Sequence, residues 1–178
     1  MVRLGAELPP GGALVTPGGW SALAALHPVI LKARVGSSLA DLENALRTGG
    51  VSLVILRPRE EVPQVLDLAL DLAPYLRLLQ AFGCEVAVEP ANEPNNPQTS
   101  FPVEHWSKRQ RDYLLLRTLL PRGVKLVAPG LMPAPVDQLL PWLNEDRAQF
   151  DYDGVHVYHT AGVQGLMLPP RTYAPVLV

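Results

Sequence analysis

Cysteine, charge and long apolar segments are all scarce in this chain. Cys84 is the only cysteine among 178 residues, which excludes an intrachain disulfide and a thiolate metal cluster. We expect it to pack as a small buried hydrophobe. Charged residues make up 18% of the chain and the formal net charge is −2, so no basic field attracts nucleic acid or an anionic membrane surface. A neutral partner such as a carbohydrate fits this charge balance better.

The sequence also shows no targeting or membrane segment. Residues 1–10 have no apolar stretch of the signal-peptide kind, and nowhere do about 18 uncharged apolar residues run together. We therefore expect a soluble protein without a membrane partner. Its compartment is unknown from the sequence, and the cytoplasm is the default.

Apolar residues make up 48% of the chain, and they fall into short runs that alternate with longer helical patterns. The 19 prolines lie between these runs and not in a low-complexity tract. Strands are expected at residues 2–8, 29–35, 51–56, 85–88, 124–128 and 154–158, and a seventh begins at 174–178. Helices are expected at residues 21–26, from Ser37 or Ser38 to Gly49, and at 62–79, 103–120 and 136–149.

This alternation predicts consecutive β-α units and therefore an α/β fold with a parallel sheet. The number and spacing of the strands favour a (β/α)8 TIM barrel over an open doubly wound sheet. The dinucleotide-binding form of the doubly wound sheet is also weakened, because no Gly-rich turn follows the first strand to hold a pyrophosphate. A complete barrel takes about 250 residues. We therefore expect residues 1–178 to form a single, incomplete barrel domain of six β-α units and the start of strand seven.

The sharpest motif is Asn92-Glu93-Pro94, directly after the fourth apolar run. Catalytic groups of such barrels lie at the carboxyl ends of the strands. Cleavage of a glycosidic bond needs an acid to protonate the leaving oxygen, and an amide donor can bind the neighbouring sugar hydroxyl. At these residues the sequence resembles the clan A glycoside hydrolases, which include many cellulases and mannanases.

The resemblance implies a role for two of these residues. In the clan, the glutamate of an Asn-Glu-Pro after strand four is the general acid/base and the asparagine contacts the sugar 2-hydroxyl. Glu93 would then be the acid/base and Asn92 its companion in substrate binding. The alternative is a turn in which Asn92 and Pro94 simply end the strand.

Residues 153–159 also resemble the clan, at its sixth strand, where a histidine and a tyrosine line the sugar subsite. Period two puts His156 and Tyr158 on one face of the expected strand. They would bind substrate or orient a carboxylate, or they would form a polar layer in the barrel core. No nearby carboxylate has convincing metal-ligand spacing, so no metal and no other cofactor is expected.

Two arginines end neighbouring strands. Arg57 ends the third run and Arg34 the second, and either would hold a catalytic carboxylate ionised. Plain ion pairing with Glu7 or Glu89 is an equal alternative for both.

Glu89 lies four residues before Glu93, in a longer Glu-x-x-Asn-Glu-Pro pattern that recurs in the clan. We favour a structural role for it, as a buried carboxylate paired with Lys32, Arg34 or Arg57.

Tryptophans offer possible sugar platforms. Trp20 and Trp106 lie near loops on the expected mouth side, where an indole face would stack on a pyranose ring. The alternatives are a helix cap for Trp20 and a core position for Trp106. Trp142, within the expected helix at 136–149, is expected to have a packing role.

A retaining glycosidase needs two carboxyl groups about 5 Å apart. The resemblance implies a strand-seven glutamate as nucleophile, and residues 173–178 look like the approach to it. We expect a glycoside hydrolase-like domain that binds a glycan and, when complete, hydrolyses it, whereas this chain alone would be inactive. The alternatives are a non-catalytic carbohydrate-binding or structural module, or a second chain or copy that covers the open barrel edge and supplies the carboxylate.

Overall fold

A computed structural model describes residues 5–8, 25, 30–48, 50–58, 64–99, 101–132, 134–155 and 176–177. Within these residues, seven strands form a sheet in chain order, and every neighbouring pair is parallel. The strands are β1 (Gly5–Leu8), β2 (Ile30–Arg34), β3 (Leu53–Arg57), β4 (Glu85–Val88), β5 (Lys125–Leu131), β6 (Tyr152–Val155) and β7 (Val176–Leu177). The predicted parallel α/β fold is confirmed.

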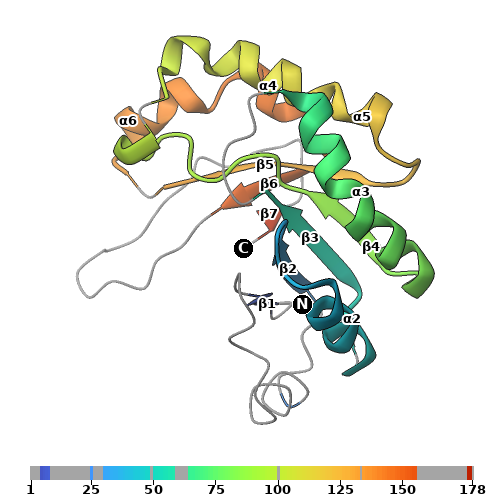
Figure 1. The fold of residues 1–178 in the computed structure, drawn as a ribbon. Helices are drawn as coiled ribbons and strands as arrows, with labels where there is room; N and C mark the ends of the chain where they lie inside the picture. The colour runs from blue at the N-terminus through green and yellow to red at the C-terminus, as the bar shows by residue number, and fades with distance from the viewer. Residues whose placement is uncertain are drawn as a thin grey trace.

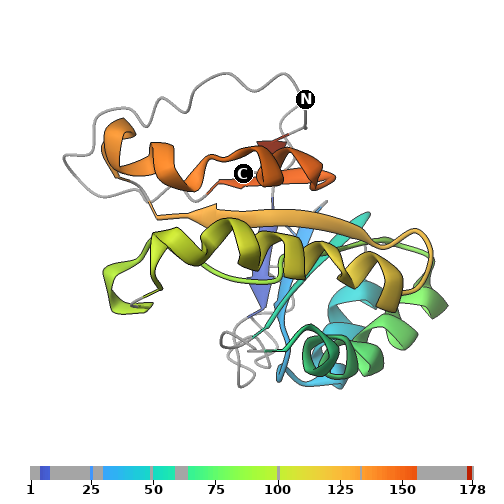
Figure 2. The ribbon, with the colours of Figure 1, turned by 90° about the horizontal axis from the view of Figure 1, so that it is seen from above.

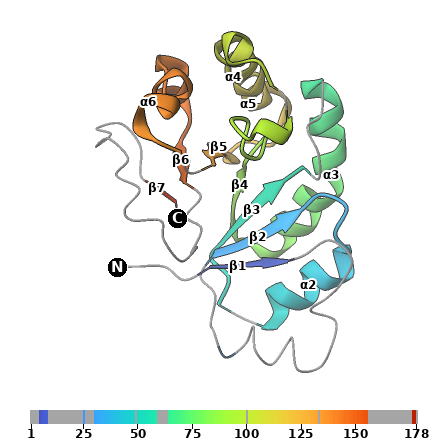
Figure 3. The same ribbon diagram turned by 90° about the vertical axis from the view of Figure 1, so that its left-hand side faces the viewer.

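The described sheet is open and strongly twisted. β1 and β7 are its outer strands, and no pairing joins them within the described part of the chain. Figure 3 shows the strands changing direction progressively from β1 to β4, as the handed twist of parallel strands requires. In Figure 1 the helices form an arc around one side of the strands.

Two helices agree closely with the expected ones. α2 (Leu39–Thr48) begins after Ser38, whose Oγ accepts a hydrogen bond from the Asp41 N–H at 3.3 Å. α3 (Val65–Phe82) ends at Gly83, which has a φ of 66° and donates its N–H to the Gln80 carbonyl. Glycine takes this left-handed conformation without the steric penalty of a Cβ atom.

The other helical segments are more broken than the sequence predicts. The expected helix at 103–120 divides into η2 (Val103–His105), α4 (Trp106–Leu114) and α5 (Leu116–Leu119), after the short turn η1 (Pro97–Thr99). Figures 1 and 2 show α4 and α5 running along β5.

A continuous helix over 136–149 was a wrong prediction. The chain instead forms α6 (Val136–Leu139), η3 (Leu140–Trp142) and η4 (Glu145–Gln149). Pro141 has no N–H to continue a helix. Asn144 then begins a new turn, because its side chain accepts the Arg147 N–H at 3.3 Å.

β5 was expected to end before Pro129 and Gly130, but it continues to Leu131. The pairing with β6 shifts register between Ala128 and Leu131. At this irregularity the Gly130 N–H donates to the Glu89 carboxylate at 2.9 Å. A Pro-Gly pair is compatible with a strand here because the local distortion replaces regular pairing. β6 begins at Tyr152, two residues earlier than expected.

Both faces of the sheet are apolar, as parallel sheets require. On one face, strand residues pack with α2, α3 and α4 into a core that contains Val54 and Leu56. The opposite face carries a smaller cluster of strand residues: Ile30, Leu53, Ile55, Ala87 and Val127. On that second face, Arg57 follows Ile55 and Glu89 follows Ala87 at alternate positions. The polar groups thus begin where the smaller apolar cluster ends.

Candidate functional site

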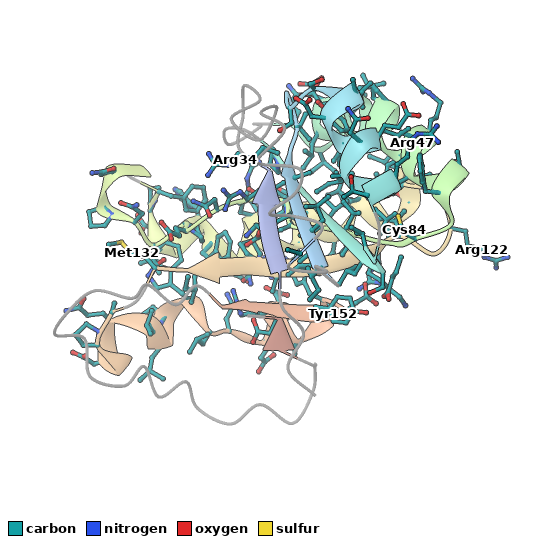
Figure 4. All side chains as sticks on the ribbon, turned by 90° about the horizontal axis from the view of Figure 1, so that it is seen from below. Arg34, Arg47, Cys84, Arg122, Met132 and Tyr152 are labelled. Carbon is teal, nitrogen blue, oxygen red and sulfur yellow. The ribbon has the colours of Figure 1, made fainter. Side chains whose placement is uncertain are left out.

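Polar side chains collect at the carboxyl ends of β2, β3 and β4. Arg34 and Arg57 stand in register at the ends of neighbouring strands. Arg57 and Glu89 are both buried. Figure 4 shows Arg34 and Met132, which mark the carboxyl ends of β2 and β5, toward one side of the molecule and Cys84 and Tyr152 toward the other. The site therefore belongs to one edge of the sheet.

Arg57 and Asn92 connect the end of β3 to the segment after β4. A guanidinium nitrogen of Arg57, Nη1, donates to Asn92 Oδ1 at 2.5 Å. Arg57 is buried, whereas Asn92 is exposed. The sequence predicted Arg57 as a partner of a carboxylate, and the structure gives it this amide as a partner.

Glu93 has a strained backbone. Its φ of 44° is the only positive value of a non-glycine residue in the described part of the chain. Such a conformation costs on the order of 1–3 kcal/mol and is enriched at functional sites. The Glu93 N–H donates to the Gly130 carbonyl of β5 at 3.0 Å, and the side chain is buried with the rest of the residue at 5% exposure.

The backbone turns directly after Glu93. Asn96 donates its N–H to the Glu93 carbonyl at 2.8 Å, and its side-chain Nδ2 lies 3.4 Å from Glu93 Oε2. The turn expected as the alternative is therefore present. The turn is compatible with the functional interpretation, because it places the Glu93 carboxylate and the Asn92 amide at the edge of the sheet.

Asn95 fixes this turn to β5. Its Nδ2 donates to the Met132 carbonyl at 2.8 Å and its Oδ1 accepts the Met132 N–H at 2.7 Å. The side chain thus reproduces both bonds of a backbone pair. Together with the bond from the Glu93 N–H to the Gly130 carbonyl, these bonds hold the segment between Glu93 and Asn96 to the carboxyl end of β5.

Glu89 has the structural role that we favoured. Its Oε2 lies 2.6 Å from Lys32 Nζ, and its Oε1 accepts the Gly130 N–H at 2.9 Å. Both carboxylate oxygens therefore have protein partners.

Arg147 and Asp153 form a buried group that sequence reasoning missed. Arg147 is 2% exposed, and its Nε donates to Asp153 Oδ1 at 2.6 Å. Its two terminal nitrogens donate to the carbonyls of Pro129 and Gly154 at 2.7 and 2.8 Å. The guanidinium therefore ties β5 to β6. Periodicity gave no signal for it, because residue 147 was expected in a continuous helix.

Three predicted site residues, Trp20, His156 and Tyr158, lie outside the described residues. Their convergence with Glu93 stays a prediction.

The stacking role considered for Trp106 was wrong. Trp106 is 1% exposed and donates its indole N–H to the Trp142 carbonyl at 3.2 Å. Its ring packs among Phe101, Tyr113 and Trp142 in the core beneath α4. The expected packing role of Trp142 is confirmed.

Within the residues that the structure describes, no three His, Cys, Asp or Glu side chains gather as metal ligands. None of the described helices combines the length and apolar character needed to cross a membrane. No protein-family model matches the chain, and no curated protein sequence matches it.

Proposed function

We propose that this chain is a glycoside hydrolase-like domain that binds a glycan at the carboxyl edge of its sheet, with Glu93 as the general acid/base of a retaining mechanism. One observation carries the proposal. Glu93, a buried carboxyl side chain, and Asn92, an exposed amide, adjoin each other just beyond β4. These are the two groups that glycosidic cleavage needs on the leaving-group side of a sugar.

The chemistry assigns Glu93 two proton transfers. In the first step its carboxylic acid donates a proton to the glycosidic oxygen while a second carboxylate attacks the anomeric carbon. In the second step the Glu93 carboxylate takes a proton from a water molecule. The water oxygen attacks the anomeric carbon and displaces the second carboxylate, the nucleophile, from the sugar. The acid and the nucleophile must lie about 5 Å apart.

Glu89 is unsuited to be that nucleophile. Its oxygens are engaged by Lys32 and by the Gly130 N–H, so attack on a sugar would break a buried ion pair. The proposal therefore assigns the nucleophile to another carboxylate, which the resemblance to the clan implies at strand seven.

The backbone strain at Glu93 supports a functional role. Asparagine or glycine takes a left-handed φ at lower cost than glutamate. A glutamate at this position therefore sacrifices some folding free energy, which is typical of a residue selected for its chemistry.

The finer fold is also part of the proposal. Seven parallel strands in chain order, with apolar side chains on both faces, are consistent with most of a (β/α)8 barrel. In such a barrel the carboxyl edge of the sheet surrounds the active-site mouth. Glu93 and Asn92 would then face a central pocket.

Hydrolysis of aryl β-glycosides tests the role of Glu93. We would assay this chain and the full product of its reading frame with leaving groups of high and low pKa. Glu93→Gln should slow hydrolysis by about 10²- to 10⁴-fold when the leaving group needs protonation. The loss should be much smaller for dinitrophenyl glycosides, whose leaving group needs no acid.

Glu104→Gln provides the matched control, because Glu104 is an exposed glutamate in η2. It should leave all rates unchanged. Equal rates for wild type and Glu93→Gln with a poor leaving group would contradict the proposed acid/base role.

The engagement of Glu89 favours one second candidate, a carbohydrate-binding module without catalysis. Both oxygens of Glu89 are engaged by protein groups, so Glu89 does not supply a nucleophile. If no other carboxylate reaches the sugar, the site would bind a glycan without cleaving it. Calorimetry with β-linked gluco-, manno- and xylo-oligosaccharides separates the two functions. Saturable binding without turnover, in both the chain and the full product, would favour the binding module.

A further inference from the structure

Arg57 and Asn92 carry an inference that deepens the proposed function and rests on it. We infer that Arg57 is a positioning residue that fixes the side-chain amide of Asn92, so that its Nδ2 faces the glycan as a hydrogen-bond donor. Arg57 itself does not touch the glycan. It determines which atom of Asn92 does.

The argument begins with the donors of arginine. A guanidinium carries five N–H donors and no acceptor, whereas an asparagine amide carries one acceptor oxygen and one donor nitrogen. At the 2.5 Å separation of Arg57 Nη1 and Asn92, the facing atom must be Oδ1. The reversed amide would set N–H groups against each other. The orientation of Asn92 is therefore fixed by its partner.

The donor side of the amide is then directed away from Arg57. Asn92 is exposed, and its Nδ2 donates to no acceptor in the described residues. Arg57, by contrast, is buried at 5% exposure, so the fixed end of the pair lies in the protein and the donor end lies at the surface. A ligand at this edge would find a preorganised N–H donor.

This orientation restricts the ligand. The atom that contacts Nδ2 must accept a hydrogen bond, as the oxygen of a sugar 2-hydroxyl does. A protonated 2-amino group has no lone pair and would be disfavoured. The inferred substrate class is therefore a glycan whose sugar in this subsite keeps a neutral 2-hydroxyl.

Two substitutions of Arg57 separate positioning from mere packing. Arg57→Lys keeps a side chain that only donates, so the Asn92 amide should keep its orientation. Arg57→Gln introduces an amide that donates or accepts, so Asn92 should take both orientations. Asn92→Asp keeps an acceptor for Arg57 and removes the donor. It should present an acceptor to the glycan in place of the donor, without loss of folding.

The readout is the ratio of dissociation constants for a glycoside and its 2-amino-2-deoxy analogue, measured at a pH at which the amine is protonated and only donates. Wild type should prefer the hydroxyl form by about three- to tenfold, the value of one hydrogen bond. Arg57→Lys should retain most of that preference, Arg57→Gln should lose most of it, and Asn92→Asp should favour the amino form, because a carboxylate only accepts. Because the measure is a ratio, a change in the folded fraction does not alter it. A wild-type ratio in Arg57→Gln would overturn the inference.

A second readout needs no glycan. The side-chain NH₂ resonances of Asn92 are assigned in nitrogen-15 spectra by their loss in Asn92→Asp. They should stay close to their wild-type positions in Arg57→Lys and shift or broaden in Arg57→Gln. If no glycan binds to wild type, the proposed function fails while this result still decides the role of Arg57. Unchanged Asn92 resonances in Arg57→Gln would refute that role.

Discussion

Lys32 and Glu89 join two strands that are not neighbours. Lys32 Nζ, on β2, lies 2.6 Å from Glu89 Oε2, just beyond β4, and β3 lies between the two strands. The other oxygen of Glu89 accepts the Gly130 N–H of β5. One carboxylate therefore connects β2, β4 and β5 beneath the proposed site. This contact braces the curved sheet at the edge where Asn92 and Glu93 lie.

Breaking this brace should destabilise the fold strongly. The side chains of Lys32 and Glu89 are 21% and 3% exposed, so Lys32→Met removes a countercharge of a buried carboxylate. We expect a loss of about 2–4 kcal/mol in the free energy of unfolding, measured by urea denaturation. Lys108→Met breaks an exposed pair with Asp112 and should cost less than about 0.5 kcal/mol. Similar losses in both variants would argue against the brace.

Arg147 should not be replaceable by lysine. Its guanidinium satisfies Asp153 and the carbonyls of Pro129 and Gly154 at once, and a single ammonium group does not match these three directions. Arg147→Lys should lower the free energy of unfolding by about 3 kcal/mol. The control is Arg117→Lys on the surface, where the expected loss is below about 1 kcal/mol. A wild-type urea midpoint for Arg147→Lys would contradict this assignment.

Gly154 should tolerate no side chain. A Cβ atom there would stand 2.5 Å from the Ala128 carbonyl oxygen and 3.0 Å from the Gly130 nitrogen, both of them backbone atoms of β5. Gly154→Ala should therefore cost more than about 2 kcal/mol, because the strands must separate. Gly83→Ala meets open space and strains only its own φ of 66°, at a cost of about 1 kcal/mol. Thermal melting of both variants tests this difference. A larger decrease in melting temperature for Gly83→Ala than for Gly154→Ala would contradict it.

Cys84 should react slowly in the folded chain. Burial raises the pKa of its thiol, and the backbone contact that lowers it is the smaller effect. Alkylation by iodoacetamide at mildly alkaline pH should therefore be faster in urea than in the native protein. Because the unfolded thiol ionises first, the folding free energy should decrease as the pH rises above the ordinary thiol pKa. Cys84→Ala should lack this part of the pH dependence, and equal alkylation rates in both states would disprove the assignment.

The parallel sheet was predictable because its information is local. Short, nearly continuous apolar runs identify strands that are buried on both faces, such as β4, whose predicted bounds, Glu85–Val88, match the observed ones. The pairing of Glu89 with a cation of another strand also followed, since residues at the carboxyl ends of parallel strands meet at one edge. Lys32 was among the partners considered.

The remaining contacts depend on tertiary geometry that periodicity does not encode. The group of Arg147 and Asp153 exists because the expected helix over 136–149 is broken, and Asn144 sets the turn that directs Arg147 inward. Likewise, the left-handed φ of Glu93 follows from its bond to Gly130, on a strand 37 residues further along the chain. No local pattern distinguishes such a residue from an ordinary strand end.

Glycan titration followed by nitrogen-15 NMR tests the central claim most directly, because it locates binding without requiring turnover. Addition of β-linked oligosaccharides should produce saturable backbone shifts centred on Asn92, Glu93 and Gly130. The distant helix α5 should be unaffected. Shifts confined to α5, or no saturable shift with any oligosaccharide of the gluco, manno and xylo series, would contradict a sugar site at the carboxyl edge of this sheet.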